Sequence, residues 1–225
     1  MRRPHVSIIH YADCMNSANS RSRLYATIIM SFPMALAFGI TLIPVVTDYG
    51  DHTLAEEAVR DATRWYLGHI LTATAFGLGI LACSCIGDVL YRMGQRKRVM
   101  IALPLIAVGG SLHAAGLGAD GVGPIAMAEA GASSRLFFDG SGDLVPMIFV
   151  AGAVIFGLGL IALMFGVSRT DLLKGVWRVI VPASSILFVA LEALPSGWGL
   201  YGVAALCFLI FAPISLALRR GILLS

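Results

Sequence analysis

Long apolar stretches alternate with short charged ones along most of the chain. Six of these stretches come close to the roughly 20 residues that an α-helix needs to cross the hydrocarbon core of a bilayer. They are 24–46, 65–90, 99–118, 144–167, 179–195 and 198–218. The fifth is the shortest, and Pro195-Ser196-Gly197 predicts a tight turn between it and the sixth. The pattern therefore predicts an all-α fold, a polytopic bundle of six transmembrane helices.

Two tails are expected to flank this transmembrane domain, which covers 24–220. The first, 1–23, does not read as a signal peptide, because its apolar run after Pro4 is short and is broken by His10 and Asp13. We expect this tail to be disordered, with Met15 as an alternative start. The second tail is 221–225.

Two of the connecting segments carry structural signals of their own. Segment 53–66 predicts a short helix that leads into the second span, with Thr53 and Glu56 as a capping box. Segment 119–143 is rich in Gly and Ser, so we expect a mobile loop that holds one helical turn around 124–130.

Composition agrees with a membrane protein. The chain has 225 residues, 58% hydrophobic and only 13% charged, whereas a soluble domain carries about 25% charged residues. Basic-aromatic clusters and a sizeable soluble domain are missing from the sequence, so nucleic acid is not an expected partner. We expect no structural disulfide, because three of the four cysteines lie inside predicted spans and the fourth, Cys14, lies in the first tail.

Basic residues predict the orientation. Thirteen of the 16 Lys and Arg residues fall on one side of a six-span arrangement, and cytoplasmic loops are the ones enriched in these residues. Both termini are therefore expected in the cytoplasm. The thirteen are Arg2, Arg3, Arg21, Arg23, Arg92, Arg96, Lys97, Arg98, Arg169, Lys174, Arg178, Arg219 and Arg220. Trp65 and Trp198 are expected at the outer interface and Trp177 at the inner one.

Two short sequences recur at an offset of 80 residues. FGLGILA at 76–82 resembles FGLGLIA at 156–162, and RVM at 98–100 resembles RVI at 178–180. Spans two and three are thus predicted to repeat as spans four and five in the same membrane orientation, although Gly-Leu-Gly also recurs by chance in apolar helices.

Small residues and prolines predict how the spans pack. Gly152, Gly159 and Gly166 follow a spacing of seven and predict one seam of close helix packing. If that seam faces lipid, it favours an accessory subunit that binds a partner there. Prolines within the spans predict kinks or local loosening at Pro33, Pro44, Pro104, Pro182 and Pro213.

Three ionisable side chains are predicted at one depth in the membrane. Counted at about 1.5 Å per residue, His69 lies about 6 Å below the outer boundary, and His113 and Glu192 lie about 20 Å above the inner one. All three fall in the outer third of a core about 30 Å thick. With Thr72 and Ser185 nearby on the same helix faces, they predict a small, partly polar site for a ligand.

Three interpretations of this polar layer stay open. It is a buried hydrogen-bond network that sets helix register, a site for a small or lipophilic ligand or a proton-linked passage, or a metal or haem site. The absence of a cofactor is the first expectation. The alternative is that His69, His113 and Glu192 form a zinc ligand set, or that the two histidines are axial ligands of haem b. Such a site would serve a redox or hydrolytic protein.

A catalytic motif is not recognisable, so no catalytic residue is assigned. We expect a non-enzymatic membrane component, either a ligand-binding or transport-like protein or an accessory subunit that binds other membrane subunits.

Segment 65–220 resembles uncharacterised bacterial integral membrane proteins of about this size. The shared features are an outer acidic segment, Gly68-His69 at the start of the second span, a basic turn, SLHAAG at 111–116 in the third span and a closing pair of spans. The resemblance implies six spans and a location in the bacterial inner membrane. It implies no activity.

Overall fold

The computed structural model describes residues 8–140, 144–194 and 196–220, with side chains described from Ser20 onward except that of Pro146. Every regular element in these residues is a helix, which confirms the predicted all-α fold. The elements are α1 (Ile8–Leu42), α2 (His52–Val59), α3 (Ala62–Arg92), α4 (Arg96–Glu129), α5 (Arg135–Gly140), α6 (Leu144–Ser168), α7 (Trp177–Glu192) and α8 (Gly197–Arg219).

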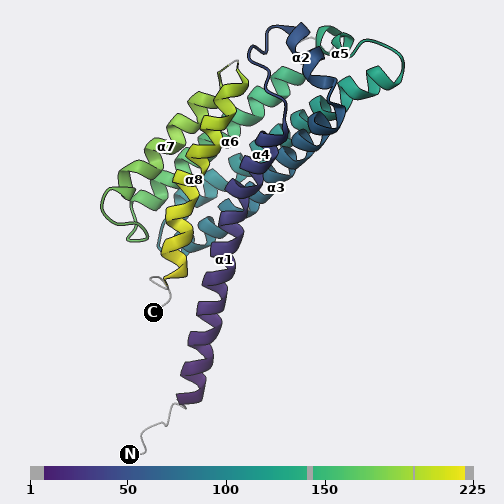
Figure 1. Cartoon of the computed structure of the whole chain (residues 1–225). Coiled ribbons are helices and arrows are strands. Elements are labelled where there is room, and N and C mark those ends of the chain that lie inside the picture. The colour runs from purple at the N-terminus through teal and green to yellow at the C-terminus, as the bar shows by residue number, and fades with distance from the viewer. Residues whose placement is uncertain (1–7, 141–143, 195, 221–225) are drawn as a thin grey trace, which may run out of the picture.

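Six long helices form a closed ring. In order around the ring, α1 packs on α3, α3 on α4, α4 on α6, α6 on α7, α7 on α8, and α8 again on α1. The short helices α2 and α5 lie together at one end of the bundle, and the α3–α4 turn, the α6–α7 loop and the end of α8 lie toward the other (Figure 1). We call these the α2–α5 end and the basic end.

Aromatic side chains fill the centre of the ring. The Phe32 ring lies 5.1 Å from that of Phe211, and the Phe76 ring lies 5.3 Å from that of Phe156. Phe188 reaches Phe156 from α7. Phe76 and Phe156 begin the two similar heptapeptides, so these sequences place the same residue type in one cluster.

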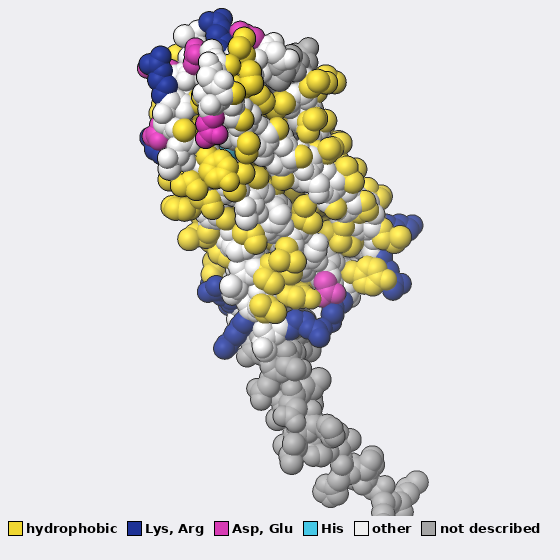
Figure 2. Space-filling model, turned by 90° about the vertical axis from the view of Figure 1, so that its right-hand side faces the viewer, with side chains coloured by type: hydrophobic (Ala, Val, Ile, Leu, Met, Phe, Trp, Pro, Cys, Tyr) yellow, Lys and Arg dark blue, Asp and Glu magenta, His cyan; other side chains and the backbone are white. Residues whose placement is uncertain are grey.

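Five of the helices are long and apolar enough to cross a membrane. They are α3, α4, α8 and the parts Ser20–Leu42 of α1 and Met147–Ser168 of α6. The predicted span 179–195 corresponds to α7, whose 16 residues rise about 24 Å. Figure 2 shows hydrophobic side chains over the middle of the visible face, between charged groups at both ends.

α1 differs from the predicted first span at both ends. It begins at Ile8, within the segment expected to be a disordered tail, and passes beyond the other helices at the basic end (Figure 1). It ends at Leu42, so Pro44 lies after the helix instead of kinking it. Residues 1–7 and the tail 221–225 lie outside the described residues.

The predicted loop 119–143 is largely helical, so the expectation of a mobile loop with a single helical turn was wrong for the described part. α4 continues without a break to Glu129, with Pro124 inside it, and a turn at Gly131 leads into α5. Gly131 has a φ of +79°, a backbone conformation that glycine adopts without steric cost. This extension carries Asp120 into the bundle as a helical residue.

The helix predicted at 53–66 is two helices. α2 ends at Val59, and Asp61 caps the start of α3 by accepting a hydrogen bond from the Arg64 backbone N–H. The predicted capping box was also wrong. Asp51 caps α2, and its carboxylate accepts from the Thr53 N–H at 2.9 Å.

The predicted glycine seam of α6 is present, and it faces α4. A methyl group on Gly152 would collide with the backbone N of His113, and one on Gly159 would lie 2.8 Å from the Ala102 carbonyl oxygen. On the α4 side, a methyl group on Gly109 would likewise collide with the backbone N of Phe156. The seam is therefore used inside the chain, which sets how α4 and α6 are rotated against each other.

Candidate functional site at the α2–α5 end

His69 contacts polar groups of two helices inside the bundle. It lies on α3 and is only 4% exposed. Its Nδ1 lies 2.7 Å from the Trp65 carbonyl oxygen, and its Nε2 lies 3.1 Å from Oδ2 of Asp120 on α4. The sequence placed His69 in a polar layer, but its acidic partner was not identified.

The two ring nitrogens of His69 make different contacts. A carbonyl oxygen only accepts, so Nδ1 carries a hydrogen and donates it to Trp65. The second contact, at Nε2, is an ion pair when the imidazole is protonated. His69 and Asp120 therefore lie close enough for a charged imidazole to pair with the carboxylate.

Trp65 holds this pair in place from the preceding turn of α3. Its ring lies 4.4 Å from that of His69, and its Nε1 donates a 2.8 Å hydrogen bond to the Asp120 carbonyl oxygen. Pro124 has no N–H to donate to that carbonyl, so the indole replaces the missing helical donor. Trp65 is 3% exposed, so its ring packs inside the bundle and does not face lipid.

Glycine allows α4 to approach His69. A methyl group on Gly121 would lie 2.7 Å from the Cβ of His69, closer than such atoms come in proteins. Position 121 therefore requires glycine for the His69–Asp120 contact to form.

The site opens toward the α2–α5 end through Asp120. The Asp120 side chain is 31% exposed, whereas that of His69 is 5% exposed. Tyr49, in the segment after α1, lies close enough that partial burial and the Asp120 carboxylate raise the pKa of its phenol to about 12. Tyr49 thus stays a neutral hydrogen-bond donor beside the carboxylate at neutral pH.

His113 lies in an aromatic environment. Its Nδ1 lies 3.2 Å from the Phe149 carbonyl oxygen on α6, and its ring lies 4.1 Å from that of Phe76 and 4.0 Å from that of Phe149. Its backbone packs on Gly152. These contacts join α3, α4 and α6 at one point, as expected for a histidine that sets helix register.

The predicted neighbours Thr72 and Ser185 use their hydroxyl hydrogens locally. Thr72 Oγ1 donates to the Gly68 carbonyl at 2.7 Å, and Ser185 Oγ donates to the Pro182 carbonyl at 2.7 Å. Both side chains are buried. The carbonyl that Ser185 binds belongs to Pro182, which lies inside α7, and Thr72 packs against Gly39 of α1.

Glu192 differs from the other predicted site residues because one of its oxygens has no partner. Its Oε2 is buried without a hydrogen bond from any described residue. The residue ends α7 toward the α2–α5 end. A carboxyl oxygen left this way is costly in a low-dielectric environment, which is typical of a functional group.

The structure does not join the three predicted metal ligands. Within the described residues, no hydrogen bond or ion pair connects His69, His113 and Glu192 with one another. The same residues contain no group of three or more His, Cys, Asp and Glu side chains that could hold a metal ion. No disulfide joins the described cysteines: Cys83, Cys85 and Cys207 are buried free thiols. The side chain of Cys14 lies outside the described residues.

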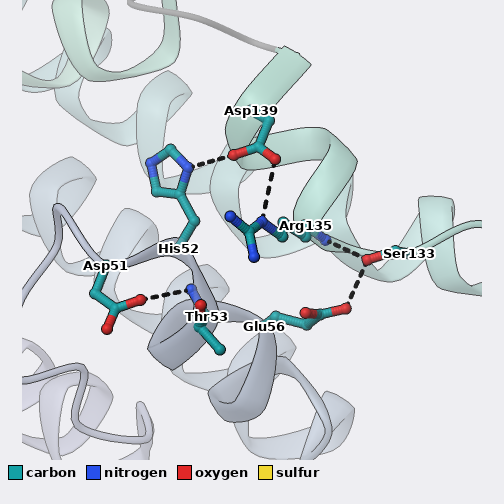
Figure 3. Close-up of polar contacts among 7 residues, drawn as sticks. All are labelled: Asp51, His52, Thr53, Glu56, Ser133, Arg135 and Asp139. Carbon is teal, nitrogen blue, oxygen red and sulfur yellow. Dashed lines mark hydrogen bonds and ion pairs between the residues drawn. The ribbon is translucent and has the colours of Figure 1, made fainter.

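A second polar network, which the sequence analysis did not identify, ties α2 to α5 (Figure 3). His52 Nδ1 donates to Asp139 at 2.6 Å, and Arg135 Nε donates to the same carboxylate at 3.2 Å. Ser133 Oγ donates to Glu56 at 2.6 Å. The sequence held one indication of this network. Arg135 is one of only three Lys and Arg residues that fall outside the predicted cytoplasmic side.

Comparisons of the chain with protein-family models, with curated proteins and with solved structures find no match.

Proposed function

We propose that this chain is a non-enzymatic, transport-like membrane protein that exchanges a proton with the outer aqueous side through His69 and Asp120. The observation that carries the proposal is the contact of Nε2 of His69 with Oδ2 of Asp120 at 3.1 Å, on a histidine whose Nδ1 already donates to a carbonyl. A histidine beside a carboxylate supplies a group that gains and loses one proton, and the partly exposed Asp120 gives it access to water.

The membrane arrangement we propose has six spans, with α7 as the shortest. α7 closes the ring between α6 and α8, so it shares their surroundings. Its rise of about 24 Å is below the usual hydrocarbon thickness of about 30 Å, and a bilayer adapts to such a mismatch by local thinning. Val179, Ile186 and Leu187 on α7 are at least half exposed, as expected for side chains that face lipid.

The basic end is proposed to face the cytoplasm of a bacterial inner membrane. The α3–α4 turn, the α6–α7 loop and the end of α8 bring most of the described Lys and Arg residues to that end, and cytoplasmic segments are enriched in them. The α2–α5 end, with His69 and Asp120, then faces outward. The 80-residue repeat remains part of this proposal, supported by the meeting of Phe76 and Phe156 in the core.

Glu192 supplies a second acidic group for a proton-linked passage. It lies on α7, across the ring from α3, and its Oε2 has no partner among the described residues. A proton carrier needs a group that can be neutral in one state and charged in another. We therefore propose Glu192 as a second proton-carrying group toward the α2–α5 end.

A transport-like role is favoured over an accessory subunit by the packing of α6. The glycine seam Gly152, Gly159 and Gly166 would be the natural docking surface for another membrane helix. Gly152 and Gly159 are occupied by α4, and Gly166 contacts Leu90 and Arg98 of the same chain. This seam is therefore not available to a partner.

Proton flux into vesicles tests the proposal. The purified protein is reconstituted into liposomes that contain a pH-sensitive dye, and an imposed membrane potential drives protons inward. We expect flux above that of protein-free vesicles, lost in Asp120→Asn and His69→Gln and kept in the control Glu57→Gln, an exposed acid on α2. Equal flux in wild type and Asp120→Asn, or none in wild type, would overturn it.

A further inference from the structure

A groove at the basic end is lined by two helices and the loop before them. It has a volume of about 410 Å³ and lies between the start of α7 and the last turns of α8. Its walls are mostly apolar and include the small residues Ala212 and Ala217. The lining residues used here are Leu173, Lys174, Trp177, Leu209, Leu216 and Arg220.

Two cations stand at this groove with no carboxylate partner among the described residues. Lys174 and Arg220 line it, and both side chains are exposed. Among the described residues neither has an ion pair, whereas the nearby Asp171 is paired with Arg178 at 2.5 Å. The positive charge at the groove is therefore free to attract an anion.

The start of α7 lies at the same place. Val176 occupies the cap position and provides no side-chain hydrogen bond, and the first residue of the helix, Trp177, lines the groove. The N–H groups after Trp177 already donate to the Gly175 and Val176 carbonyls, so α7 contributes the positive end of its helix dipole, which favours a negatively charged group. Arg220 lies opposite, at the end of α8.

The apolar length of the groove fits one acyl chain. From Phe208 to Arg220, α8 rises about 18 Å, close to half of a hydrocarbon core about 30 Å thick. Leu209 and Leu216 are 43% and 52% exposed, so this wall is not covered by the rest of the chain. One leaflet of the bilayer supplies chains of this length at this depth.

We propose that this groove binds one anionic phospholipid from the leaflet at the basic end, with its phosphate between Lys174, Arg220 and the start of α7 and an acyl chain along α8. Charge complementarity selects the headgroup, because a zwitterionic lipid adds a cation that Lys174 and Arg220 repel. Trp177 lies where the headgroup meets the chain, the usual position of an amphipathic ring. The inference is independent of the proton site at the other end.

Native mass spectrometry of the detergent-purified protein with added phosphatidylglycerol or phosphatidylcholine tests the site. We expect wild type to bind phosphatidylglycerol about tenfold more tightly, and Lys174→Gln/Arg220→Gln to bind the two lipids about equally. The control Lys97→Gln/Arg169→Gln removes two exposed cations from the same end but outside the groove. It should keep the preference.

Fluorescence quenching by lipids with brominated chains gives a second measurement. Quenching by brominated phosphatidylglycerol that exceeds quenching by brominated phosphatidylcholine, and that disappears in Trp177→Phe, supports the site. Ala212→Leu, which fills the groove, should reduce it. Equal binding of both lipids by wild type, or an unchanged preference in Lys174→Gln/Arg220→Gln, would overturn the proposal.

Discussion

The Nε1 atom of Trp65 lies 2.8 Å from the carbonyl oxygen of Asp120, the carbonyl that Pro124 leaves without its helical donor. One indole therefore does two things. It allows a proline inside α4, and it brings Asp120 next to His69. The helix extension, the proline and the polar pair at the α2–α5 end depend on one another.

This dependence predicts a coupling between Trp65 and Pro124. Trp65→Phe should lower the free energy of unfolding by about 1–3 kcal/mol, because it leaves a buried carbonyl without a donor. In a Pro124→Ala background the backbone N–H returns, so the same substitution should cost less. Unfolding of the four proteins in detergent gives the coupling energy, and additive effects would contradict the arrangement.

Close packing of α4 on α6 predicts opposite effects for two glycines of one helix. Gly109→Ala should destabilise the fold by about 1–3 kcal/mol or more, because the new methyl group meets the Phe156 backbone, which cannot move aside like a side chain. Gly118 has nothing within 4 Å of an added Cβ, so Gly118→Ala should be neutral or stabilising by up to about 1 kcal/mol. Thermal unfolding of both variants in detergent measures the difference, and equal effects would show that the α4–α6 contact is looser.

The α2–α5 network predicts a loss of local order in acid. Hydrogen bonds from His52 and then from Arg135 hold the pKa of Asp139 below its usual value. A carboxyl with a lowered pKa in the folded state stabilises that state above its unfolded pKa of about 3.9, and this contribution disappears as the pH falls through the lower folded value. Protection of α5 amides against hydrogen exchange should therefore fall in this acidic range.

Asp139→Asn provides the control for this network. The amide lacks the charge, so α5 should exchange faster than in wild type at neutral pH and show little further change in acid. Asp51, whose pKa is lowered mainly by the Thr53 backbone N–H, titrates in the same region but on α2. Acid sensitivity of α5 that persists in Asp139→Asn would assign the effect to Asp51 or another group.

The unpartnered oxygen of Glu192 predicts a stabilising substitution. Glu192→Gln removes a potential buried charge and should raise the free energy of unfolding by about 1 kcal/mol while lowering proton flux. Gain of stability with loss of function is the expected signature of a residue kept for its chemistry. A loss of stability instead would mean that Glu192 has a structural partner.

Metal content decides the alternative interpretation of the polar layer. His69 and His113 each contact a different carbonyl oxygen through Nδ1, and the described residues contain no three-ligand group. We expect mass spectrometry of the purified protein to find no stoichiometric zinc or iron that depends on either histidine. Metal at about one atom per chain, lost in both His69→Ala and His113→Ala, would restore the zinc or haem interpretation.

Much of the helical framework could be predicted from the sequence. An apolar run of about 20 residues is long enough to cross a bilayer, and an α-helix is the structure that satisfies its backbone hydrogen bonds there. The segments 65–90, 144–167 and 198–218 each lie within one helix. The glycine seam could also be predicted, because a spacing of seven places Gly152, Gly159 and Gly166 on one side of a helix. This holds whichever helix packs against that side.

Only one of the two residues of the His69–Asp120 pair could be predicted from the sequence. His69 was identified because a histidine in an apolar run is unusual, but Asp120 was assigned to a loop, since glycines and Pro124 surround it. Helix propensity argues against α4 continuing there. The donor that replaces the missing N–H comes from Trp65, 55 residues earlier in the chain.

The sequence by itself therefore determined which segments are apolar helices, where charge gathers and which buried side chains are costly. Tertiary structure alone decided that α4 extends to Glu129, that His69 pairs with Asp120, and that Glu192 keeps an oxygen without a partner among the described residues. The reason is physical. Apolar length and charge are properties of one segment, whereas a hydrogen-bond partner depends on how two helices are rotated and shifted against each other, which glycines such as Gly109 and Gly121 set by contact.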